Sequence, residues 1–264
     1  MPKLKRTEEE KKAREGTEFI ESLDRGLRVL LSFGVDRHPM TLSDIAKSAN
    51  LPRATVRRIL MTLQKSGFVA GDERLFSLTP RILLLASAYL TSNQISSVLQ
   101  PLMDDVAAKA REVCSVAVLH DDEVVFIARS SPARVFSTGL DIGYRLPAFC
   151  TSVGRVLLSR LSNEELADKI NGMTLKAQTP STLLDKPTLI ATIMTDRTKG
   201  YSLVDREAEE GFRSISVPIR RYDGTIVAAA NIGAHVDRIT TGEMIDRFLP
   251  LLKDLSAAAQ PLMV

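Results

Sequence analysis

Three arginines near the start of a short predicted helix are the residues of this chain best suited to reading another molecule. Arg53, Arg57 and Arg58 follow Pro52, in a segment whose apolar residues keep one helical face for a core. The arginines are left on the exposed face. An α-helix fits the major groove of DNA, and a guanidinium can pair with guanine or with phosphate through two hydrogen bonds. The spacing therefore predicts a DNA-reading helix.

The residues around this helix predict a complete small DNA-binding module. Residues 41–66 have the pattern of two short helices joined by a tight turn, and Gly67 suits the end of the second. Two short apolar runs follow at 68–70 and 75–78, with turn residues between them. This hairpin is typical of the wing of a winged helix-turn-helix, and Arg74 lies at its tip. The alternatives are an ordinary helical hairpin with a solvated basic face and a winged helix that binds protein.

Upstream apolar residues at helical spacing predict a third helix that packs beneath this pair, namely Ile20, Leu23, Leu27, Leu30 and Leu31. The module would then span residues 19–80, behind a flexible, mixed-charge arm over 1–18. Its candidate DNA-binding residues are Thr41, Ser43, Arg53, Thr55, Arg57, Arg58 and Arg74.

A second stretch with chemical potential covers residues 143–158. Thr151 or Ser152 can cap a predicted helix over 152–161, after a loop containing Gly143 and Pro147. Free backbone N–H groups and the dipole at a helix start favour an anion. The N–H groups of Ser152 and Val153, with the hydroxyls of Thr151 and Ser152, are therefore candidate donors to a carboxylate. A helix cap without any ligand is the alternative.

An enzymatic interpretation of the same stretch is weaker. Residues 150–154 resemble the G-x-S-x-G elbow of α/β-hydrolases, but cysteine replaces the first glycine and no strand is predicted directly before it. The histidines His38, His120 and His235 offer no evident partner for Ser152 and no metal-ligand spacing. Nucleotide-binding glycine motifs are also missing from the sequence. We therefore predict no catalytic residue, no metal and no cofactor, with a hydrolase that carries an incidental helix-turn-helix as the alternative.

Composition favours a protein of the cytoplasm that can bind nucleic acid. The formal charge of +3 is uneven, because residues 1–80 hold 15 basic and 11 acidic residues while the remainder is close to neutral. Two cysteines are too few for a disulfide scaffold, which favours a reducing compartment. The charged N-terminus lacks the apolar core of a signal peptide, and no apolar run has the length of a membrane span.

The rear of the chain predicts an α+β domain over residues 94–264, joined to the front by a linker helix over 81–93. Strands are expected at 114–119, 123–129, 135–140, 214–221 and 225–233, and helices at 95–113, 152–161, 164–170, 186–199 and 241–259. Hairpins bracketed by helices favour an antiparallel sheet, one face of which can be hollowed for a small ligand. The linker helix is apolar enough to pack on a second subunit or on its own chain.

The chain resembles the IclR family of transcription regulators from about residue 20 to the end. The likeness is carried by the winged helix together with GYRLPAFCTSVGRVLL and GYSLVDREAEEGFRSISVPIRRYDGTIVAAANI. ESLDRGLRVLLSFG, LPRATVRRILMTL and FSLTPRILLLASAYL further resemble the β-ketoadipate-pathway branch, the Pca and Pob regulators. The resemblance implies a GAF/profilin-like effector domain, a homodimer or dimer of dimers, and control of aromatic-acid catabolism.

The same resemblance implies an effector pocket between a curved sheet and the start of the 152–161 helix. Its polar groups would be Thr151, Ser152, Val153, Ser214 and Asn231, and its apolar wall would be Leu140, Leu146 and Phe149. An acidic position of a glyoxylate-responsive relative falls on Val204, which favours a larger, less polar ligand. The expected partners are operator DNA, a small aromatic or dicarboxylic acid such as protocatechuate, 4-hydroxybenzoate or β-ketoadipate, and RNA polymerase if the protein activates. Activation and repression are left open.

Overall fold

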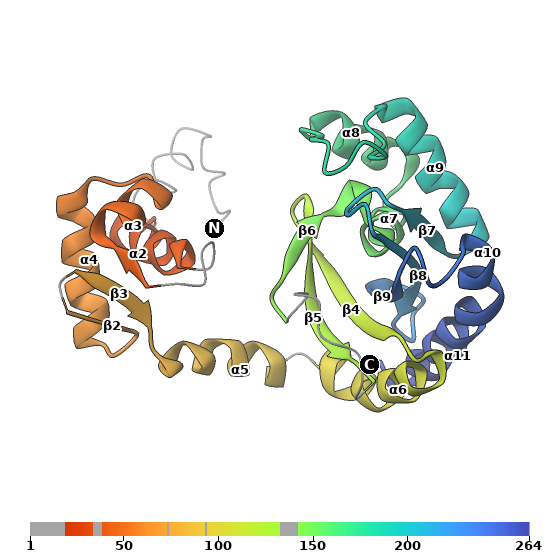
Figure 1. Ribbon diagram of the computed structural model, residues 1–264, viewed down its shortest axis with the longest axis horizontal. Helices are drawn as coiled ribbons and strands as arrows, with labels where there is room; N and C mark the ends of the chain where they lie inside the picture. Colours follow the sequence, from red (N-terminus) through yellow and green to blue (C-terminus); the bar gives the residue numbers. More distant parts are fainter. Residues whose placement is uncertain (1–18, 34–38, 73, 93, 133–141, 264) are drawn as a thin grey trace, which may run out of the picture. The chain divides into compact units, whose positions relative to one another are not determined.

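The computed structural model of the chain describes residues 19–33, 39–72, 74–92, 94–132 and 142–263. The chain divides into two compact units, Met1–Tyr89 and Leu90–Val264 (Figure 1). Among the described residues, no helix has the length and apolarity needed to cross a membrane. The predicted arm over 1–18, the strand over 135–140, Leu140 and His38 lie outside the described residues.

Three helices and a small sheet form the first unit. The helices are α2 (Glu21–Ser32), α3 (Leu42–Ser48) and α4 (Arg53–Lys65). Strands β1 (Met40–Thr41), β2 (Val69–Gly71) and β3 (Leu75–Leu78) pair in the order β1-β3-β2. Pro52 immediately precedes α4 instead of being its first residue, and Gly67 follows its end with a positive φ of 75°. The predicted winged helix-turn-helix is therefore confirmed, with a two-residue strand that the sequence did not indicate.

Helix α2 faces differently from the prediction. Of the predicted apolar residues, Leu30 packs against the core beside the completely buried Val29, while Leu23, Leu27 and Leu31 are 58%, 49% and 76% exposed. The core of the unit is instead closed by α3, α4 and the hairpin, through residues that include Ile45, Val56, Leu60 and Phe76. Helical spacing correctly indicates an apolar face, but it does not tell which surface that face meets.

The helix that follows the wing begins with a 3-10 turn at Pro80–Ile82 and continues as α5 (Leu83–Ser92). Leu83, Leu84 and Leu85 are exposed at consecutive positions, so apolar side chains leave α5 in several directions. An isolated helix that is apolar on all sides is unfavourable in water and needs a covering surface.

A six-stranded antiparallel sheet organises the second unit, in the order β6-β5-β4-β9-β8-β7. Its strands are β4 (Val113–His120), β5 (Glu123–Ser130), β6 (Arg145–Pro147), β7 (Ser202–Asp205), β8 (Phe212–Arg220) and β9 (Ile226–His235). The two predicted hairpins are present, as β4-β5 and β8-β9. Asp121 and Gly224 in their turns adopt the positive φ values that such tight turns require.

Helices cover both faces of this sheet (Figure 1). On one face α6 (Gln94–Ala110) and α11 (Leu249–Ala259) enclose a core that contains Leu99, Ile215 and Phe248. On the other face α7 (Ser152–Leu158), α8 (Asn163–Gly172) and α9 (Lys186–Lys199) enclose a second core around Phe126, Leu157 and Ile193. The α+β class predicted from the sequence is confirmed.

Three local predictions need correction. Residues 145–147 were expected in a loop and no strand was predicted over 202–205, yet these segments pair as β6 and β7 at the two edges of the sheet. The helix expected over 241–259 is divided into α10 (Thr241–Glu243), a π-helical turn (Met244–Phe248) and α11. Pro250 explains the division, because it has no N–H to continue the regular hydrogen-bond ladder.

Candidate functional site

The helix-turn-helix is held in shape by hydrogen bonds within the first unit. The Thr41 hydroxyl accepts from the Asp44 backbone N–H at 3.2 Å and so caps α3. The Thr41 hydroxyl and backbone N–H in turn donate to the Asp44 carboxylate, which lowers the pKa of that carboxyl. Arg28 on α2 donates to the carbonyl of Ala49 at 2.5 Å, in the turn between α3 and α4. These contacts fix the direction in which α4 leaves the turn.

The exposed face of α4 carries the predicted basic residues. Arg53, Arg57 and Arg58 are all exposed, and Thr55 is half-buried. Ser43 is exposed at the start of α3. The burial of Val56 and Leu60 leaves the three arginines of α4 exposed, as the sequence pattern indicated, whereas Thr55 turns toward α2.

The wing is tied to α4 and presents Arg74 at its tip. Gln64 on α4 donates to the carbonyl of Gly71 at 3.2 Å. Asp72 accepts from the backbone N–H groups of Arg74 and Leu75, both at 3.1 Å, and these bonds hold the pKa of Asp72 below its usual range. Arg74 is exposed. The wing is therefore hydrogen-bonded to α4, and both elements carry exposed arginines.

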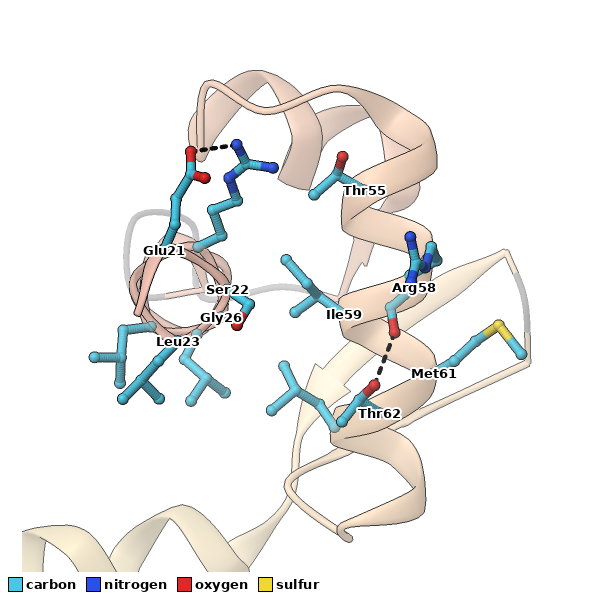
Figure 2. A pocket seen from close by; sticks show the side chains of 13 residues that line it. Glu21, Ser22, Leu23, Gly26, Thr55, Arg58, Ile59, Met61 and Thr62 are labelled. Carbon is cyan, nitrogen blue, oxygen red and sulfur yellow. Dashed lines mark hydrogen bonds and ion pairs between the residues drawn. The ribbon is translucent and has the colours of Figure 1, made fainter. Parts of the chain in front are cut away.

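A groove of about 840 Å³ lies between α2 and α4 (Figure 2). Thr55 and Ile59 point from α4 toward α2, and Leu23 and Leu27 belong to its other wall. Arg58 stands at the edge of the groove. Most of its lining surface is apolar, and it includes leucines of α2 that the core of the unit leaves exposed.

In the second unit, Thr151 caps α7 as the sequence predicted. Its hydroxyl accepts from the Gly154 backbone N–H at 3.2 Å. Gly154 is required at this position, since an added Cβ would lie 2.0 Å from the carbonyl oxygen of Ala148. The preceding 3-10 turn (Ala148–Cys150) thus packs its backbone directly against α7, which fixes where the helix begins.

The side chain of Ser152 joins α7 to the sheet. Its hydroxyl is hydrogen-bonded to the hydroxyls of Ser214, at 2.7 Å, and Ser216, at 2.6 Å, both on β8. Ser152 and Ser216 are completely buried. The predicted pair of Ser152 and Ser214 is therefore brought together, and Ser216 joins it. Ser216 could have been predicted from the sequence, because side chains two positions apart on a strand, such as Ser214 and Ser216, point to the same face of the sheet.

Asn231 on β9 is the register partner of Ser216 on one side and of Ser115 on the other. It is 7% exposed, and its Oδ1 atom has no hydrogen-bond partner among the described residues. Buried polar atoms are nearly always paired, so an unpaired acceptor needs a reason. Asn231 was named in the sequence analysis as a candidate effector contact. Ser115 was not named, because its position next to Asn231 depends on strand pairing, which the sequence does not report.

Two of the three apolar residues predicted for the pocket wall belong to the core on the α7 side of the sheet. Phe149 and Val153 are buried in the core beneath α7, and Leu146 packs against it. Phe212 lies on the same strand as Ser214 and Ser216, at a position that the sequence analysis did not single out. Its ring covers Gly233, where an added Cβ would lie 2.3 Å from the ring.

Buried charged side chains connect α7 to the loop between β7 and β8, residues 206–211. Arg155 pairs with Glu207 at 2.7 Å and donates to the Phe149 carbonyl at 2.9 Å. Acidic side chains in a loop usually face solvent, but Glu207 is held inside by the buried guanidinium of Arg155. Asp196 accepts from the Ser202 hydroxyl at 2.6 Å, and burial raises its pKa.

The site offers little for nucleophilic or metal chemistry. The hydroxyl of Ser152 is bonded to serines, while His120 and His235 lie beside exposed aspartates. Burial raises the pKa of both thiols, Cys114 and Cys150, to about 12. In the described ranges, no group of three potential metal ligands is found. A cluster of neutral hydroxyls with an unpaired amide oxygen is suited to binding a polar ligand.

A winged helix joined to a domain with a polar cluster inside a curved antiparallel sheet defines a ligand-responsive transcription regulator. Comparison with known proteins identifies the family. Residues 22–73 match the IclR helix-turn-helix domain, and residues 87–260 match the bacterial transcriptional regulator IclR C-terminal domain. The chain belongs to the IclR family of transcription regulators.

Individual relatives agree with this assignment. The chain is 41% identical to the Pca regulon regulatory protein of Pseudomonas putida, over 89% of this chain and 81% of the relative. A crystal structure from Rhodococcus sp. RHA1 is 36% identical with a TM-score of 0.81, over 93% of this chain and 98% of that one. The inducer-binding domain of an Acinetobacter PobR double mutant, solved with 3-hydroxybenzoic acid, is 35% identical with a TM-score of 0.60, over 63% of this chain and 97% of that one.

Proposed function

We propose that this IclR-family regulator controls genes for the breakdown of aromatic acids and responds to a small carboxylate effector. The observation that carries the proposal is the polar cluster of Ser152, Ser214 and Ser216 beside the unpaired oxygen of Asn231. Two relatives support the chemical class, since one is named for the Pca regulon and the other holds a hydroxybenzoic acid.

We infer that the effector carboxylate binds at the start of α7. Donors there are the backbone N–H groups of Ser152 and Val153 and the hydroxyls of Thr151, Ser152 and Ser214. Charge-assisted hydrogen bonds contribute about 1.5–3 kcal/mol each. Because Ser152 is now bonded to two serines, a ligand that enters must replace these bonds with its own. Leu146 and Phe149 supply apolar surface, and Leu140, outside the described residues, is proposed for the same wall.

DNA binding is assigned to residues 19–80, with residues 81–93 as the linker and 94–264 as the effector domain. The exposed arginines of α4 enter the major groove, Arg74 approaches the backbone or minor groove, and Thr41 and Ser43 face phosphates. These roles are supported by exposure and by the charge of this surface. A regulator that reads DNA works where the DNA is, so we expect the protein in the cytoplasm.

A homodimer, or a dimer of dimers, gives the exposed apolar helices a partner. Helix α5 exposes Leu83, Leu84 and Leu85, and α2 exposes Leu23 and Leu31. Large exposed apolar surface of this kind commonly marks a subunit contact. A second copy would also place two reading helices on a palindromic operator. Sedimentation of the full chain tests this, and a monomer at micromolar concentration would contradict it. RNA polymerase becomes a partner if the regulator activates.

No observation favours the hydrolase alternative, and the proposal is a regulator without catalytic activity. Purified protein assayed with esterase substrates tests this directly. Turnover that is lost in Ser152→Ala would overturn it.

The decisive experiment for the effector site is Ser152→Asp. A fixed negative charge would occupy the place of the ligand carboxylate, so effector affinity should fall on the order of 100-fold and the transcriptional response should be lost. Operator binding should remain, because Ser152 is in the other unit. Ser162→Asp, an exposed helix cap that stays a cap, is the matched control. Unchanged effector affinity by calorimetry would place the carboxylate elsewhere.

A further inference from the structure

We propose that Arg28 is a positioning residue for sequence-specific DNA binding. It acts from α2, without contact to the DNA, by holding the turn from which the reading helix α4 begins. The inference rests on the proposed DNA-reading role of α4 and adds a residue that lies on another helix. The partners of Arg28 are 21 and 22 positions further along the chain, so the sequence pattern does not reveal its role.

The guanidinium of Arg28 joins α2 to the end of α3. Its Nη2 atom donates to the backbone carbonyl of Ala49 at 2.5 Å and to that of Asn50 at 3.3 Å. Carbonyl groups at the end of an α-helix lack partners within the helix and lie at the negative end of its dipole. A cation that donates to them stabilises this end of α3, and Arg28 thereby fixes the backbone of the turn.

Asn50 gives the turn a conformation that needs support. Its φ is 51°, in the left-handed region that residues with a Cβ rarely adopt. The backbone N–H of Leu51 donates to the carbonyl of Ala46 at 3.0 Å, which closes the end of α3. Pro52 follows directly, and α4 begins at Arg53. Because two residues separate Asn50 from α4, a change in the backbone of Asn50 alters the direction of the whole helix.

Arg28 itself starts from a fixed point of the core. Its neighbour Val29 is completely buried, and Leu30 packs against the same core. Val56 and Leu60 are the buried residues of α4, and they determine which face of that helix is turned inward. The turn determines where α4 begins and at which angle it leaves α3. The two restraints together bring the exposed arginines of α4 to the positions from which they can reach base edges.

Positioning and direct contact predict different losses of affinity in Arg28→Met. Non-specific binding depends mainly on positive charge, whereas specific binding also requires side chains in register with base edges. We therefore expect the affinity for a specific duplex to fall about tenfold, while the affinity for DNA of scrambled sequence changes less than about twofold. A contact of Arg28 with phosphate would instead weaken binding to both duplexes and make its salt dependence shallower.

The test measures gel shifts of the full-length protein with two duplexes. One is selected from a random-sequence pool by the wild type, and the other has the same bases in scrambled order. Arg28→Lys keeps the charge but not the planar guanidinium, so the ratio of the two affinities should fall about threefold. Arg25→Met is the matched control, because Arg25 lies three positions earlier on α2 and pairs with Glu21 of the same helix. Its loss should leave the ratio within about twofold of the wild type.

Thermal unfolding shows whether each variant is folded at the assay temperature. If Arg28→Met does not fold, Arg28→Lys decides the question alone. A wild-type ratio in the decisive variant, or an equal loss of affinity for both duplexes, would overturn the positioning role of Arg28 and leave the role of α4 in place. Failure of the wild type to select any duplex from the pool would refute the DNA-reading role of α4 itself.

Discussion

Arg57 is the single residue on which the DNA-reading role of α4 is most easily tested. Its side chain is exposed, and the helix beneath it is anchored by Val56 and Leu60. If Arg57 pairs with a base edge, Arg57→Ala should weaken operator binding by about 1–3 kcal/mol and relax the sequence preference. Gel shifts with operator and scrambled DNA measure both effects.

Contact with phosphate alone predicts a different result for the same variant. Affinity should then fall equally for every sequence, and the salt dependence of binding should become shallower. Arg160→Ala, an exposed arginine of the second unit, is the control and should change neither quantity. Wild-type affinity in both Arg57→Ala and Arg58→Ala would refute the recognition-helix assignment.

The start of α7 depends on a close approach between two backbones. An added Cβ at Gly154 would lie 2.0 Å from the carbonyl oxygen and 2.4 Å from the Cα of Ala148, and backbone atoms cannot rotate away. Gly154→Ala should therefore destabilise the effector unit by about 3 kcal/mol. Gly172→Ala, where no atom lies within 4 Å, should be neutral or slightly stabilising. Urea unfolding compares the two, and equal midpoints would contradict the packing described for α7.

The junction of α9 and β7 should make stability depend on pH. Burial raises the pKa of Asp196 above its ordinary value, so the native state favours the protonated acid. The contribution of protonated Asp196 to the free energy of unfolding is complete below the pKa of the unfolded state. That contribution is lost as the pH rises through the pKa of the native state. Asp196→Asn keeps an acceptor for Ser202 and removes this loss. The variant should therefore gain stability relative to the wild type as the pH rises from 3 to 7. Thermal unfolding of both proteins, at intervals of about one pH unit, measures this difference.

Asp185→Asn serves as the opposite control on the same helix. Hydrogen bonds from Thr188 lower the pKa of Asp185, so the native state favours its charged form. Its stabilising contribution is present above the unfolded pKa and disappears as pH falls. The cost of Asp185→Asn should accordingly shrink at low pH. A difference between Asp196→Asn and wild type that does not change with pH would refute the assignment for Asp196.

At the scale of the whole molecule, the effector unit should fold without the DNA-binding unit. Both cores that enclose the six-stranded sheet are built entirely from residues after Leu90. A protein of residues 90–264 should unfold in one cooperative transition and bind effector as the full chain does, while losing operator binding. Calorimetry and gel shifts measure these properties. A soluble fragment that gives no heat with a ligand active on the full chain would contradict the prediction.

The sequence by itself determined the features that depend on near neighbours. The periodicity of α4, the positive φ at Gly67 and Gly224, and the cap formed by Thr151 follow from residues within a few positions of one another. Such interactions act along one helix or turn, so their pattern is visible in the order of the residues. The class, α+β with a winged helix, followed from the succession of these elements.

Tertiary structure alone decided how distant segments meet. Ser152 and Ser216 are 64 positions apart, and the neighbours of Asn231 depend on the register of three strands. A register shift of one residue would turn every side chain to the other face, which local sequence does not report. The outward face of α2 and the pairing of Glu207 with Arg155 were decided in the same way, because burial depends on what the rest of the chain brings alongside.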